Sequence, residues 1–199
     1  MLRLLLSILT ICISTVNTVN AQEYENTPFV GWRASDSLEE VDTGTTINLD
    51  ETRSYGLLLS LKQDPDVSYD FLFSRQNTQL QPDSPTGSTE SLRLDYYQIG
   101  GTVFYDYDKL LPFVTGGLGA THISPANVAF SSETKFSLSL GGGLKVPLTQ
   151  HLGLRFEARG YGTVVGSSGA ILCSGGCVVK FNGSLFMQFE ASAGLSVAF

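Results

Sequence analysis

The chain has 199 residues, with 12 Lys and Arg against 19 Asp and Glu, a formal net charge of −7 and 21 glycines. Its length suits a single domain. The acidic balance argues against a nucleic-acid-binding protein, because such proteins present a basic patch to the phosphate backbone. Only 16% of the residues are charged, against roughly 25% in an average soluble domain, yet no apolar run reaches the roughly 20 residues of a membrane-spanning helix. Two classes remain, a secreted β-protein and a membrane β-barrel.

Residues Met1 to Ala21 have the form of a secretory signal peptide. Arg3 supplies a basic start, Leu4 to Ile13 form an apolar stretch, and small polar residues follow. We expect cleavage before Gln22, which divides the chain into a signal peptide, residues 1–21, and one domain, residues 22–199.

The three cysteines fall into two groups. Cys12 lies in the expected signal peptide, and lipid attachment there is an alternative that Ile11 disfavours, because such processing needs a small preceding residue. Cys173 and Cys177 enclose Ser174-Gly175-Gly176. Since an exported chain meets oxidising conditions, we expect a disulfide that closes a short local loop. A redox or metal site is a weaker alternative, because the spacing is not C-x-x-C and no histidine is near.

From Pro28 onward the hydrophobic pattern has a period of two, which is typical of half-buried strands. In the last segment the odd-numbered residues from Leu185 to Phe199 are apolar, whereas the even-numbered ones from Gln188 to Ser196 are polar or small. The same alternation predicts eight strands, at residues 28–35, 52–62, 67–79, 90–105, 112–123, 134–146, 152–165 and 183–199. Most of them reach the roughly 9–11 residues that cross a bilayer at a steep tilt.

The connections between these strands alternate in length. Short turns lie at residues 63–66, 106–109 and 147–151, and longer polar loops at 36–51, 80–89, 124–133 and 166–182. This asymmetry is typical of bacterial outer-membrane barrels, whose short turns face the periplasm. A sheet in lipid must also close, because an open edge leaves backbone groups without partners. The sequence therefore predicts an all-β fold, an eight-stranded antiparallel up-and-down transmembrane β-barrel with both ends of the mature chain in the periplasm.

An eight-stranded barrel has an interior that side chains just fill, so the polar strand faces are expected inside. Buried charges persist only when they are paired, which predicts a polar network that plugs the lumen. Its expected charged members are Asp70, Arg93, Asp95, Arg155, Glu157, Arg159 and Glu190, with Lys62 and Lys145, and its expected uncharged members are Tyr97, Tyr161 and Gln188. An exchange of ion-pair partners among Arg155, Glu157, Arg159 and Glu190 that opens a narrow path is the alternative. Aromatic residues near strand ends suit interfacial girdles, namely Trp32, Tyr55, Tyr69, Phe104, Tyr105, Tyr107 and Phe199.

The signal-like start, the eight alternating segments and the stretch from Glu190 to Phe199 resemble the small outer-membrane β-barrel family, that of the transmembrane domain of outer-membrane protein A and its short relatives. Phe199, with Val197 and Leu195 at alternating positions before it, is similar to the C-terminal signal that the barrel-assembly machinery reads in that family. The resemblance covers the whole mature chain. It implies localisation in the cell outer membrane and contact with outer-membrane lipids and lipopolysaccharide, and it implies neither a cofactor nor a metal.

Two local patterns allow other chemistry. His122-Ile123-Ser124 resembles the His-x-Ser of outer-membrane lipid A deacylases, with Glu133 as a candidate carboxylate, but Pro125 stands where that family carries an Asn. The loop at residues 36–51 is acidic, which would attract divalent cations. Its spacing matches no ion-binding motif, so a solvated acidic loop is the simpler account.

The expected function is a structural or surface-interaction role through the extracellular loops, with an extracellular partner, no nucleic acid and no enzymatic activity. A narrow channel for small or apolar solutes is the alternative, and a lipid A-modifying esterase is a further one. A soluble lipocalin-like barrel would place apolar residues inside, and alternation alone does not distinguish it. The signal peptide, the unequal connections and Phe199 favour the membrane barrel.

Overall fold

A computed structural model describes residues 24–35, 38–39, 46–82, 90–107, 110–126, 131–164, 170–171, 179–180 and 185–199. The expected signal peptide, Cys173 and Cys177 lie outside these residues, so the leader and the disulfide stay predictions. The described part of the chain contains no helix of the length and apolarity needed to cross a membrane.

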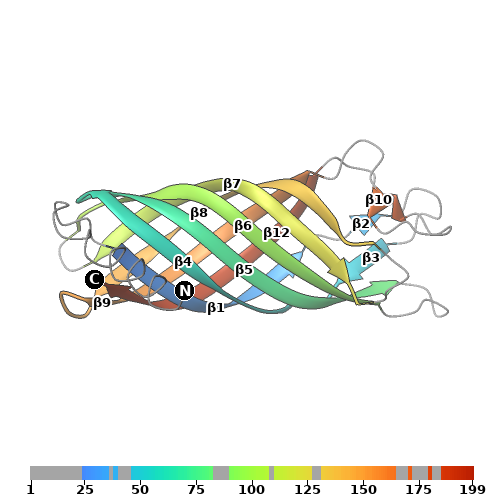
Figure 1. The fold of residues 1–199 in the computed structure, drawn as a ribbon. Coiled ribbons are helices and arrows are strands. Elements are labelled where there is room, and N and C mark those ends of the chain that lie inside the picture. Colours follow the sequence, from blue (N-terminus) through green and yellow to red (C-terminus); the bar gives the residue numbers. More distant parts are fainter. Residues whose placement is uncertain are drawn as a thin grey trace, which may run out of the picture.

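Long strands of 12 to 16 residues form one closed antiparallel sheet (Figure 1). They are β1 Tyr24–Ser35, β4 Thr52–Asp64, β5 Val67–Pro82, β6 Glu90–Phe104, β7 Leu111–Pro125, β8 Glu133–Pro147, β9 Leu152–Val164 and β12 Leu185–Ala198. Each pairs with the next long strand along the chain, and β1 pairs with β12, which closes the barrel. The predicted up-and-down barrel of eight strands is confirmed.

The first strand begins earlier than predicted. Tyr24 and Glu25 pair with Leu61 and Ser60 of β4, so β1 starts before Pro28. Four short strands lie within segments predicted as loops, β2 Leu38–Glu39, β3 Thr46–Leu49, β10 Ala170–Ile171 and β11 Val179–Lys180. β3 pairs with residues 80–82 of β5. The sheet therefore continues past the start of β4, next to the last residues of β5.

The two ends of the barrel differ, as the alternating connections predict. At the turn end, short connections at 65–66, 105–110 and 148–151 join the strands. The Phe199 N–H donates to the Tyr24 carbonyl there at 2.8 Å, so the start of β1 and the end of β12 meet (Figure 1). At the loop end, the connections span residues 36–51, 83–89, 126–132 and 165–184.

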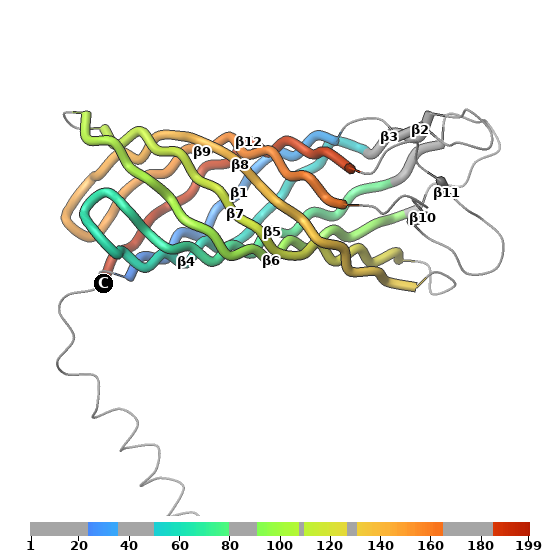
Figure 2. The backbone as a smooth tube through the Cα atoms, turned by 90° about the horizontal axis from the view of Figure 1, so that it is seen from above, coloured from blue at the N-terminus to red at the C-terminus, as the bar shows by residue number. Residues whose placement is uncertain are grey.

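The strands are tilted against the barrel axis (Figure 2). Buried and exposed residues alternate along them, so their side chains alternate between the lumen and the outside. The middle of the outer wall is apolar, with Val30, Phe71, Ile99, Leu118, Leu140 and Phe189 among the exposed side chains. Such a continuous apolar surface is unusual on a soluble monomer. Lipid hydrocarbon is the environment that suits it.

Glycine is required where the inward face meets a bulky neighbour. A Cβ on Gly143 would overlap the Phe156 carbonyl oxygen and lie 2.7 Å from Phe113 Cζ. On the outer wall, a Cβ on Gly116 would meet its nearest atom, the Ser139 carbonyl oxygen, only at 3.7 Å.

We therefore expect Gly143→Ala to lower the free energy of unfolding by about 1–3 kcal/mol, because the added methyl overpacks the wall. Gly116→Ala should change it by less than about 0.5 kcal/mol. Equilibrium urea unfolding of the refolded barrel, followed by heat-dependent migration on a detergent gel, measures both. Equal unfolding midpoints for the two variants would contradict this packing.

Candidate functional site

The inward faces bring polar side chains from all sides of the barrel into the lumen. The largest fully buried side chains include those of Arg33, Tyr96, Tyr161, Gln76, Gln98 and Gln188. The lumen also contains Asp70, Arg155, Glu157, Arg159 and Glu190 of the sequence prediction, all with little exposure.

The centre of the lumen is an ion pair between Arg33 and Glu190, which face each other on the paired strands β1 and β12. Arg33 Nη2 lies 2.5 Å and Nε 3.1 Å from Glu190 Oε2. The same oxygen accepts a hydrogen bond from Ser74 Oγ at 3.2 Å, and Glu190 Oε1 accepts one from Tyr161 Oη at 3.0 Å. Two more strands, β5 and β9, thus hold this carboxylate.

Two tyrosine rings enclose the Arg33 guanidinium. Its Cζ lies 4.8 Å from the ring centroid of Tyr96 and 4.7 Å from that of Tyr161. Both distances fall within the range of cation–π attraction, which strengthens when the groups are desolvated, and Arg33 is 0% exposed. Tyr96 Oη donates in turn to Gln188 Oε1 at 2.7 Å.

A second charged cluster lies on β9, closer to the turn end. Glu157 is bound from both sides, by Arg155 Nη2 at 2.8 Å and by Arg159 Nε at 2.5 Å. Arg155 also lies over the Phe113 ring at 3.9 Å, and Arg159 Nη1 donates to Ser139 Oγ at 3.0 Å. The three residues predicted here are therefore in direct contact.

The turn end of the lumen carries two further pairs. Asp70 accepts hydrogen bonds from Ser68 Oγ at 2.9 Å and from Thr102 Oγ1. Lys145 forms an ion pair with Glu25. Sequence reasoning missed Glu25, because the predicted strand began after it. It also missed Arg33, although Arg33 lies between the apolar Trp32 and Ala34 and therefore fits the period-two pattern.

An apolar cluster lies toward the loop end of the lumen. Leu92, Leu94, Ile123 and Phe186 are buried there and pack in one cluster with Tyr96 and Tyr161. Buried polar side chains such as Gln76, Thr78 and Thr121 lie at the same heights. The sequence prediction did not contain this apolar cluster.

The structure corrects the lumenal placement of Arg93 and Asp95, and with them that of Tyr97. In β6 the even-numbered Leu92, Leu94 and Tyr96 face inward, whereas Arg93 and Tyr97 are exposed on the outside. Asp95 lies on the same outer face, where it accepts from Arg75 Nε at 2.6 Å and Nη2 at 2.9 Å. The physical reason is height along the strand: near the loop end the outside meets polar surroundings rather than hydrocarbon, so outward residues need not be apolar.

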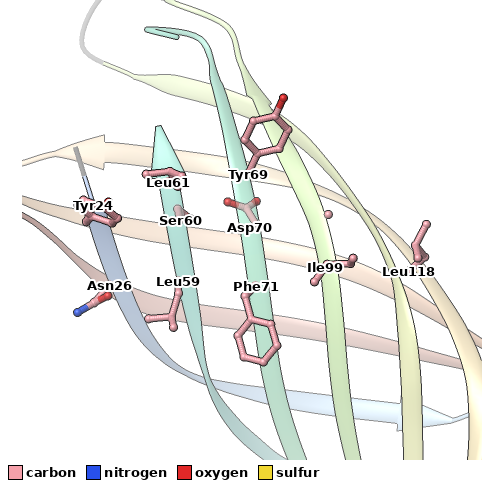
Figure 3. A pocket seen from close by; sticks show the side chains of 11 residues that line it. Tyr24, Asn26, Leu59, Ser60, Leu61, Tyr69, Asp70, Phe71, Ile99 and Leu118 are labelled. Carbon is pink, nitrogen blue, oxygen red and sulfur yellow. The ribbon is translucent and has the colours of Figure 1, made fainter. Parts of the chain in front are cut away.

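Little free space is left at the centre. A hollow lined by Leu58, Leu72, Glu157, Tyr161 and Glu190, among others, has a volume of about 10 Å³, which is about the room of one water molecule. A larger hollow of about 690 Å³ lies on the outer wall, toward the turn end (Figure 3). Outward side chains such as Leu59, Phe71 and Leu118 line most of it, and the inward-facing Ser60 and Asp70 also border it.

The candidate esterase residues contact other partners. His122 Nδ1 lies 2.9 Å from Thr134 Oγ1, Ser124 Oγ accepts from Arg93 Nη2 at 3.4 Å, and Glu133 pairs with Lys135 at 2.9 Å. These three side chains do not form the hydrogen-bonded series that a His-activated Ser nucleophile needs. Over the described ranges, no group of three or more His, Cys, Asp or Glu side chains is placed to hold a metal ion.

Solved structures share this fold. The neisserial surface protein NspA is 14% identical with a TM-score of 0.62, over 88% of this chain and 97% of that one. The outer membrane protein OprG of Pseudomonas aeruginosa is 11% identical with a TM-score of 0.63, over 90% and 96%. The outer membrane protein AlkL is 16% identical with a TM-score of 0.56, over 92% and 94%. No curated protein matches the chain.

Residues 9–194 match the family model described as the outer membrane protein beta-barrel domain. The match includes every long strand, with only the last residues of β12 outside it. The chain therefore belongs to the outer membrane protein β-barrel family, and its location is the outer membrane.

Proposed function

We propose that this protein is a non-conducting outer-membrane barrel that acts through its outer surface and loops. The observation that carries the proposal is the centre of the lumen, where Arg33, Glu190, Tyr96 and Tyr161 contact one another across the barrel. These side chains come from β1, β12, β6 and β9. A solute would have to separate them in order to pass.

Separation of the central pair is unfavourable. A guanidinium or carboxylate that is buried and loses its partner costs about 3–5 kcal/mol, and Leu92, Leu94, Ile123 and Phe186 pack on the loop side of the pair. The pair therefore stays closed unless some other interaction replaces it. This argues against the narrow channel and against a path opened by partner exchange.

The outer surface then carries the function. In barrels of this kind the short turns face the periplasm, which directs the loop end to the cell exterior. The partners that we propose are outer-membrane lipids and lipopolysaccharide at the wall and an extracellular partner at the loops. Phe199 is 71% exposed at the end of β12, where the barrel-assembly machinery would reach it.

Conductance across planar bilayers tests the proposal. Wild-type protein should give no current steps above background, because the central contacts fill the lumen. The double variant Arg33→Ala, Glu190→Ala removes the pair and should give small, frequent steps. Gly116→Ala, whose change lies on the outer wall, serves as control and should stay silent. Regular steps from the wild-type protein would refute the plug and support the channel.

Unfolding energies test whether the pair is as tightly coupled as its geometry indicates. Glu190→Ala leaves Arg33 buried without its carboxylate and should lower the free energy of unfolding by about 3–5 kcal/mol. The double variant Arg33→Met, Glu190→Met should recover most of this loss, because both buried charges are then gone.

The matched control is Arg93→Gln on the outer wall, which should change stability by less than about 1 kcal/mol because that ion pair is partly exposed. Urea unfolding in lipid vesicles gives all three values. If the double Met variant is no more stable than Glu190→Ala, then the loss does not come from an unpaired Arg33 charge, and the expected coupling of the pair is wrong.

A further inference from the structure

Three arginines gather on the outer wall at the loop end, on neighbouring strands. Arg53 lies on β4, Arg75 on β5 and Arg93 on β6. Their sequence neighbours Ser54, Gln76 and Leu94 are buried inward, so the arginines point to the outside. Since β5 lies between the other two strands, Arg53 and Arg93 are about two strand spacings, roughly 10 Å, apart.

A buried carboxylate fixes two of these guanidinium groups. Asp95 is 2% exposed although it lies on the outer face, because Arg75 binds both of its oxygens, at 2.6 and 2.9 Å, and Arg93 Nε lies 3.5 Å from Oδ2. The two arginines keep side-chain exposures of 30% and 47%. Each guanidinium has more N–H donors than Asp95 uses, so donors remain for a ligand outside.

The arginines lie at the level of the outer aromatic girdle. Arg53 is paired with Trp32 and Arg75 with Tyr55, and Trp32 and Tyr55 are both exposed. Arg75 also lies over the Phe73 ring at 5.5 Å. Trp and Tyr mark the membrane–water interface of a barrel, which places the guanidinium groups at the height of the lipid headgroups.

Arginines are concentrated here although the whole protein has a net charge of −7. The carboxylates nearby are Asp95, Glu51, which accepts from Trp32 Nε1 at 3.4 Å, and Asp50. The site therefore rests on the geometry of the guanidinium N–H donors and not on an excess of positive charge. Beside Arg93 runs a polar groove of about 560 Å³, lined in part by Asp50, Asn77 and Ser124, which offers room and hydrogen bonds for a headgroup.

We propose that Arg53, Arg75 and Arg93 form a binding site for the phosphate of a membrane lipid in the outer leaflet. Guanidinium groups match phosphate oxygens with paired N–H donors, which a lysine cannot do. The site rests on the part of the proposed function that assigns lipids to the wall, and it does not depend on whether the lumen conducts. Conductance tests the plugged lumen and lipid retention tests this site, so the two failures are distinguishable.

Lipid retention measures the site. The full barrel is reconstituted in nanodiscs of phosphatidylcholine with a minor share of phosphatidic acid, and native mass spectrometry counts the lipids that remain bound. Wild-type protein should retain phosphatidic acid in preference to phosphatidylcholine. Each of Arg53→Gln and Arg93→Gln should weaken this preference about fivefold, and the double variant should multiply the two losses. Arg75 is kept, because it holds Asp95.

The matched control is Lys135→Gln, which removes the same charge at the same end of the barrel but from a side chain paired with Glu133 at 2.9 Å. It should retain the lipid as the wild type does. Unchanged retention in the double variant would overturn the site, as would an equal loss in the control, which would indicate a general charge effect. Displacement by inorganic phosphate would assign the site to a soluble anion instead of a lipid.

Folding is checked by heat-dependent migration on a detergent gel. If the double variant does not fold, Arg53→Gln alone carries the test, since Asp95 then keeps both of its arginine partners. A single variant that folds and retains the lipid fully would overturn the part assigned to Arg53.

Discussion

The structure depends on the closure of one sheet in an environment without water. Backbone N–H and C=O groups have no other partners in hydrocarbon, so β1 must find β12 across the whole length of the chain. Closure of eight strands fixes an interior that side chains must fill. Alternation then sends every second residue into that interior, and the charges among them are stable only in pairs. The ion pairs of the lumen are thus a consequence of closure.

The central network joins neighbouring strands and also strands that are not neighbours. Glu190 on β12 accepts a hydrogen bond from Tyr161 on the adjacent β9 and one from Ser74 on β5, and Arg33 on β1 lies over the ring of Tyr96 on β6. The contacts made by Ser74 and Tyr96 cross the lumen and add to the backbone hydrogen bonds of the wall. Removal of one partner therefore leaves several others without theirs, which is why partial satisfaction of such a network is costly.

The sequence predicted the wall better than the interior. Period-two alternation located the eight strands and the turn end, because hydrocarbon imposes a strict apolar face over the middle of each strand. It correctly separated the faces of β9, where Glu157 lies between Arg155 and Arg159. The alternation gave the wrong faces for β6. Beyond the aromatic girdle, toward the loop end, the outside of the barrel is polar, so an outward residue such as Asp95 can be charged. The narrow interior can there hold an apolar residue such as Leu94. Which charges pair also escaped prediction, since Arg33 and Glu190 are far apart in sequence.

The two arginine environments show how position decides what the same group does. Arg33 has no exposed surface, and its charge is balanced by Glu190 and two tyrosine rings, so it serves packing and closes the lumen. Arg93 Nε lies 3.5 Å from Asp95 Oδ2, its Nη2 donates to Ser124 Oγ at 3.4 Å, and about half of its side chain is exposed. Because these contacts use only part of its N–H donors, the rest are available at the level where anionic headgroups lie. The side chains that can bind a partner thus lie on the outer wall and at the loop end, whereas the buried side chains of the interior stabilise the closed barrel.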